Sequence, residues 1–177
     1  MIAVSGTQHG TNTFNVGACA SSPGCAPAVW QQAVGSKLLT ALNKYSDESP
    51  GTTTSWTTIR STTDETVQPQ GGSHPTSSLK GATNILIQSV CKGRRTGHIA
   101  SAVDSVSFAA AKDAIEHSGP AKVSRLPSNV CSHPFAIGLD EFGTYVLLSV
   151  AKQLTSGNQT SMPKVLAEPA VKSYAKR

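Results

Sequence analysis

The sequence predicts an α+β fold, a two-layer sandwich in which two main helices cover one face of a largely antiparallel sheet. Segments with helical spacing of apolar residues alternate with pairs of extended segments, as helix–strand–strand over residues 27–91 and again over 99–150. Apolar residues make up 38% of the 177 residues, which is enough for one core. Runs of threonine favour extended backbone because threonine is β-branched. We therefore expect a single domain over residues 1–177.

The first helix is predicted over residues 27–45, after a short strand or ordered arm at residues 1–7. Pro27 suits the first helical position, because its missing N–H would have no partner there. Ser49-Pro50-Gly51 ends the helix. Apolar side chains recur between these limits at helical spacing, at Trp30, Val34, Leu38, Ala41, Leu42 and Tyr45.

The middle of the chain is predicted to hold a second helix among extended segments. The expected elements, in order, are a strand over 52–63, a polar loop over 64–78, a strand over 82–91, a helix over 99–117 and a short strand over 121–126. Ser118-Gly119-Pro120 is typical of a helix C-terminus and ends the second helix.

Residues 135–150 are predicted to form a β-hairpin whose four-residue loop is Asp140–Gly143. A helix over 140–154 is the alternative, since Phe142, Val146 and Val150 are four residues apart. The tail from Thr155 is polar and is expected to wrap the surface.

Four cysteines in a chain rich in serine and threonine, with only 14% charged residues, indicate two disulfides in an exported protein. The favoured pairing is Cys19–Cys25 with Cys91–Cys131, because residues 21–24 form a turn between the first two. Residues 1–6 lack the basic start and long apolar core of a signal peptide. Since the cysteines indicate an exported protein, we expect this sequence to be the mature, secreted form.

The net charge of +5 is too small for a dedicated nucleic-acid binder, and it allows weak attraction to anionic cell walls or membranes. Lys92-Gly93-Arg94-Arg95 forms a basic loop between a strand and a helix. Backbone N–H groups at the start of a helix favour anions, so Arg94 and Arg95 are predicted to bind an anion. The same dibasic pair, like Lys176-Arg177, is a candidate for proteolytic processing.

An exported chain with dibasic pairs, few cysteines, a glycosylation sequon at Asn158 and a helix-covered sheet resembles the fungal killer toxins. The resemblance implies a protein that acts on the wall or membrane of other cells without turning over a substrate. It also implies cleavage after Arg95, which would leave two chains joined by Cys91–Cys131.

Two alternatives stay open: a small basic secreted ribonuclease and a non-enzymatic structural or envelope component. Ribonuclease chemistry needs an acid, a base and a cation, for which His98, beside the two arginines, and His74 are the candidates. Cysteine and histidine spacing does not favour a zinc site, and disulfide pairing competes for the same cysteines. The sequence contains no Walker A, GxGxxG, GxSxG or HExxH motif, so no cofactor and no metal is predicted.

Overall fold

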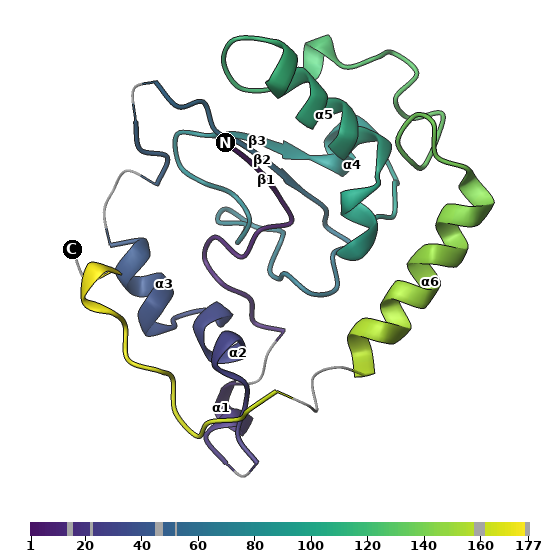
Figure 1. Ribbon diagram of the computed structural model, residues 1–177. Helices are drawn as coiled ribbons and strands as arrows, with labels where there is room; N and C mark the ends of the chain where they lie inside the picture. The colour runs from purple at the N-terminus through teal and green to yellow at the C-terminus, as the bar shows by residue number, and fades with distance from the viewer. Residues whose placement is uncertain (14–15, 22, 45–47, 52, 158–161, 176–177) are drawn as a thin grey trace.

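The computed structural model describes residues 1–13, 16–21, 23–44, 48–51, 53–157 and 162–175 (Figure 1). At its centre is a three-stranded sheet in the order β1 (Ile2–Val4), β2 (Thr57–Arg60) and β3 (Thr83–Leu86). Both neighbouring pairs are parallel. The prediction of a largely antiparallel two-layer sandwich is therefore wrong.

The lengths of the connections explain the parallel pairing. A parallel neighbour needs a crossover of about a dozen residues or more, whereas a hairpin needs only a few. Residues 5–56 join β1 to β2, and residues 61–82 join β2 to β3, so both connections can return the chain to the same end of the sheet.

The first connection contains α1 (Val16–Cys19), α2 (Pro27–Gln32) and α3 (Lys37–Leu42), which lie together beside the sheet in Figure 1. The single helix predicted over 27–45 is broken between α2 and α3. Gly35 adopts a φ of +77°, a conformation that a helix does not tolerate. Ser36 then starts α3 by accepting the N–H of Leu39 on its hydroxyl at 3.1 Å.

One face of the sheet packs against α5 (Ser105–Glu116), and this contact forms the core. The helix predicted over 99–117 is divided into a 3₁₀ turn, η1 (Ile99–Ala102), and α5. Asp104 separates them because its carboxylate caps α5, accepting the N–H groups of Val106 and Ser107. The buried core residues are Ile59, Ile85, Ile87, Cys91, Val106, Ala110 and Ala121.

Three further helical elements, α4 (Ile87–Val90), η2 (Val123–Arg125) and α6 (Glu141–Gly157), lie where strands or a hairpin were predicted. The strand predicted over 82–91 is extended only over β3 (Thr83–Leu86), and its second half forms the helix α4. The short strand predicted over 121–126 is a 3₁₀ turn, η2. The hairpin predicted over 135–150 is wrong, because α6 occupies the region, as the alternative prediction had it. Asp140 caps α6 by accepting the Gly143 N–H at 2.5 Å, so the expected loop starts a helix.

The C-terminal segment returns to the first helices and ends in η4 (Ser173–Ala175), as Figure 1 shows. The indole Nε1–H of Trp30 donates to the carbonyl of Val165 at 3.1 Å, and Cys25 pairs with Val165 in a β-bridge. The carboxylate of Glu168 accepts the N–H of Lys37 at 2.8 Å, at the start of α3.

Both predicted disulfides, Cys19–Cys25 and Cys91–Cys131, are present and confirm the preferred pairing. No helix in the described ranges is both long and apolar enough to cross a membrane. The sequon at Asn158 and the terminal pair Lys176-Arg177 lie outside the described residues.

Candidate active site

A histidine and an aspartate come together beyond the ends of two neighbouring strands. Asp64 follows β2, and His98 follows β3 and α4. Because β2 and β3 are parallel, their carboxyl ends lie at the same edge of the sheet. The imidazole Nδ1 of His98 lies 3.0 Å from the carboxylate Oδ2 of Asp64.

Asp64 is held rigidly and is removed from solvent. Its side chain has no exposed surface. Its Oδ1 accepts the N–H groups of Thr66 and Val67, both at 2.8 Å, so the carboxylate is also bonded to its own loop. A carboxylate held in this way can orient a partner without moving.

The contact with Asp64 determines which ring nitrogen of His98 carries a proton. An ionised carboxylate only accepts hydrogen bonds, so Nδ1 of His98 is the donor. In the neutral ring, Nε2 then presents its lone pair. The His98 side chain is 35% exposed, and no hydrogen bond to Nε2 is found among the described residues. Nε2 of His98 is therefore free to act as a base, while Nδ1 is bonded to the buried carboxylate of Asp64.

The electrostatics of the pair favour its charged forms. Burial raises the pKa of Asp64, but hydrogen bonds from His98, Val67 and Thr66 outweigh burial and hold the pKa below its ordinary value. The hydrogen bond to Asp64 raises the pKa of His98, with burial opposing and the charges of Asp64 and Glu65 adding to the rise. Such an arrangement stabilises the imidazolium that forms when a base takes up a proton.

Other histidine–carboxylate pairs in the described chain differ from this one. These pairs are His9–Glu48, His117–Asp113 and His133–Glu141. Asp113 is already bound by the guanidinium of Arg125 at 2.6 Å, and the two glutamates are partly exposed. Within the described ranges, only Asp64 combines complete burial with the absence of a lysine or arginine ion pair, which singles out Asp64–His98.

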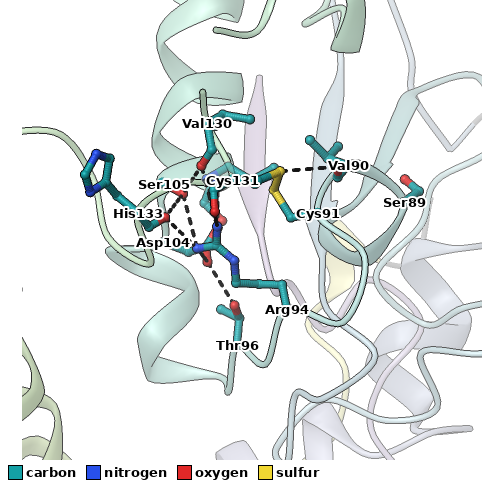
Figure 2. Close-up of a disulfide and its surroundings, with 12 residues drawn as sticks. Ser89, Val90, Cys91, Arg94, Thr96, Asp104, Ser105, Val130, Cys131 and His133 are labelled. Carbon is teal, nitrogen blue, oxygen red and sulfur yellow. Dashed lines mark hydrogen bonds and ion pairs between the residues drawn. A yellow bond between two sulfur atoms is a disulfide. The ribbon is translucent and has the colours of Figure 1, made fainter. Parts of the chain in front are cut away.

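The segment before His98 is anchored by the Cys91–Cys131 bridge and by Arg94. Figure 2 shows the Arg94 side chain extending from the loop after Cys91 toward the segment that contains Cys131. Its guanidinium donates to the carbonyls of His133 and Cys131 at 2.8 and 3.1 Å, and lies 3.4 Å from the Asp104 carboxylate. Arg94 therefore holds the loop to the start of α5.

The other residues predicted from the sequence lie apart from the pair. Arg95 and His74 are exposed, and no hydrogen bond or ion pair among the described residues links either of them to His98. Because the guanidinium of Arg94 is only 11% exposed and already bonded, Arg95 is the more available cation of the two. Anion binding at Arg94 and Arg95, and cleavage after Arg95, stay predictions.

Sequence reasoning missed Asp64, which it assigned to a polar loop. The signal that could have found it is the order of two strands, each followed by a titratable residue. That signal has meaning only in a parallel sheet, where both carboxyl ends share an edge. In the predicted antiparallel sheet, the ends of successive strands alternate between edges, so Asp64 and His98 would have been placed apart.

A cavity of about 510 Å³ lies between α5 and the segment before α6, and it includes neither Asp64 nor His98. Its walls include the apolar side chains of Phe108, Phe135 and Leu139. The charged groups at its rim are paired with one another, as in Lys112–Glu116. The cavity thus offers apolar volume, whereas the exposed base belongs to the Asp64–His98 pair.

Comparison with known proteins finds similar solved structures, one of which is a lipase. No family model and no curated protein matches the chain. The crystal structure of lipase B from Aspergillus fumigatus matches with a TM-score of 0.79 and 31% sequence identity. The match covers 98% of this chain and 44% of the lipase chain, so this chain spans less than half the length of the lipase. The chain therefore has the fold of the matched part of that lipase.

Proposed function

We propose that this chain carries the histidine base and its orienting aspartate for the hydrolysis of esters by acyl transfer. The single observation that carries the proposal is the fully buried Asp64 bonded to Nδ1 of a half-exposed His98. This is the base–orienter half of a nucleophile–histidine–acid triad. The likeness to a lipase supports an ester as the substrate class.

In the proposed reaction, Nε2 of His98 takes the proton of a serine hydroxyl while the serine oxygen attacks the ester carbonyl. His98 then gives that proton to the departing alcohol, and water releases the acyl group by the same route. Asp64 keeps the ring in the required tautomer and stabilises its charged form. Since the pKa of His98 is raised and the base acts when neutral, the rate should rise with pH through a value above 6.5.

The lipase chain is more than twice as long as the matched region, and we propose that a segment outside residues 1–177 supplies the serine. Ser5 directly follows β1 and has a strained φ of +49°, as nucleophilic serines often do. However, it is 5% exposed, and its hydroxyl has no partner among the described residues, including His98. These facts argue against Ser5 as the nucleophile.

Hydrolysis of p-nitrophenyl butyrate by the full-length protein that contains these residues tests the proposal. Asp64→Asn and His98→Ala should each lower kcat by about 10⁴-fold or more. His117→Ala is the matched control, because it removes a histidine from another histidine–aspartate pair, and it should leave kcat unchanged. A His98→Ala protein within tenfold of the natural rate would refute the role of His98.

The position of the nucleophile has its own measurement. A fluorophosphonate probe should label a serine outside residues 1–177, found by peptide mass spectrometry, and the label should depend on His98. A chain of residues 1–177 that becomes labelled by itself would locate the nucleophile within it. We also infer that the protein is secreted, supported by its two disulfides. Action on the surface of other cells, as in the killer toxins, stays a prediction.

A further inference from the structure

The segment that contains His98 is aligned with the segment that contains Asp64 by bonds from side chain to backbone. The Thr63 hydroxyl accepts the N–H of Thr96 at 2.9 Å and donates to the Thr96 carbonyl at 3.1 Å. Two residues further along both segments, Oε2 of Glu65 accepts the N–H of His98 at 3.0 Å. These contacts flank Asp64 on one segment and Gly97 on the other, so they set the register in which the ring of His98 meets Asp64.

Gly97 provides the space that the Glu65 carboxylate occupies. A Cβ at position 97 would lie 2.5 Å from Oε2 of Glu65, closer than real Cβ contacts allow. The backbone of Gly97 does not have a left-handed φ, so the close approach alone accounts for glycine here. Glu65 is exposed, and its carboxylate would turn into solvent if a methyl group were added at Gly97.

The ring of His98 does not help to hold the backbone at the start of η1. His98 precedes η1 and makes no side-chain cap to it, because its ring is bonded to Asp64. The turn behaves as one unit, since the N–H and hydroxyl of Ser101 both donate to the carbonyl of Gly97, at 2.9 and 3.0 Å. Glu65 therefore holds the His98 end of this unit to the segment of Asp64.

We propose that Glu65 is a positioning residue for His98, with its carboxylate admitted by the missing side chain of Gly97. Asp64 holds the ring and Glu65 holds the backbone of the same histidine, so that together they fix the direction of Nε2. This inference rests on the proposed function of His98 as the base. The charged groups that act on the ring among the described residues are Asp64 and Glu65.

Three variants of the full-length protein test the inference: Glu65→Ala, Glu65→Gln and Gly97→Ala. Three quantities are measured: kcat and KM for p-nitrophenyl butyrate, and the pKa of His98 from NMR titration of its imidazole. Glu65→Ala and Gly97→Ala should each lower kcat by about 10- to 100-fold with KM unchanged, because misplacing a catalytic group by 1 Å can cost about 100-fold. Glu116→Ala, which removes an exposed carboxylate elsewhere, is the control and should change none of the three quantities.

Glu65→Gln separates position from charge. Its amide oxygen can still accept the His98 N–H, so kcat should return to near the natural value, while the pKa of His98 falls because the charge is gone. The inference is overturned if Glu65→Ala and Gly97→Ala keep the natural kcat, or if Glu65→Gln loses as much kcat as Glu65→Ala. If His98→Ala itself stays active, the proposed function fails, whereas the NMR titration still reports whether Glu65 acts on the ring.

Discussion

The two disulfides should contribute unequally to stability, because they close loops of different length. Cys91 and Cys131 are 40 residues apart, and Cys19 and Cys25 are six apart. In the chain-entropy model, a cross-link stabilises by restricting the unfolded chain, and the effect grows with the logarithm of the loop length. That relation gives about 4 kcal/mol for the longer loop and about 2 kcal/mol for the shorter one at 25 °C.

The folded structure adds to this difference. Cys91 is only 4% exposed, and the bridge joins the end of α4 to the segment whose carbonyls bind Arg94. Equilibrium urea unfolding of a Cys91→Ser/Cys131→Ser protein and of a Cys19→Ser/Cys25→Ser protein measures both losses. The reasoning is refuted if the second protein loses as much free energy of unfolding as the first. Unchanged m-values would show that the comparison is valid.

Two further predictions concern buried carboxylates on α5. The hydrogen bond from Arg125 lowers the pKa of Asp113 from 3.8 to about 2, so the stability that this pair contributes is present above pH 4 and is lost as the pH falls toward 2. Urea unfolding from pH 5 to 2 should show this loss in the natural protein and a smaller one in Arg125→Ala. Asp104→Ala should lower the free energy of unfolding by about 3 kcal/mol, because it removes the cap of α5 and leaves Arg94 without its ion pair. Asp104→Asn, which can still cap, should lose less; an equal loss would contradict the part assigned to the charge.

Local features of the fold could be predicted because they depend on neighbouring residues. Pro27 starts α2, and the turn between Cys19 and Cys25 brings those two cysteines together. The break within the predicted helix over 27–45 depends on a positive φ at Gly35 and a hydroxyl cap by Ser36. The spacing of apolar residues over 27–45 does not detect a break at either residue.

The direction of strand pairing could not be predicted in this way. Periodicity shows that a segment is extended, but a parallel and an antiparallel neighbour bury the same alternating side chains. The error carried over to the candidate site. The sequence predicts ribonuclease chemistry for His98 beside two arginines, whereas its partner in the structure is Asp64. Asp64 lies near His98 because β2 and β3 run in the same direction.

The return of the C-terminal segment to the first helices has a consequence for synthesis of the chain on the ribosome. Trp30 and Val165 are 135 positions apart, and Lys37 and Glu168 are 131 apart. At roughly 5–20 residues per second, the partners of α2 and α3 are made about 7–27 seconds after the helices themselves. Through that interval, the indole of Trp30 and the first N–H groups of α3 lack these partners. The helices α2 and α3 therefore complete these contacts only late in the synthesis of residues 1–177.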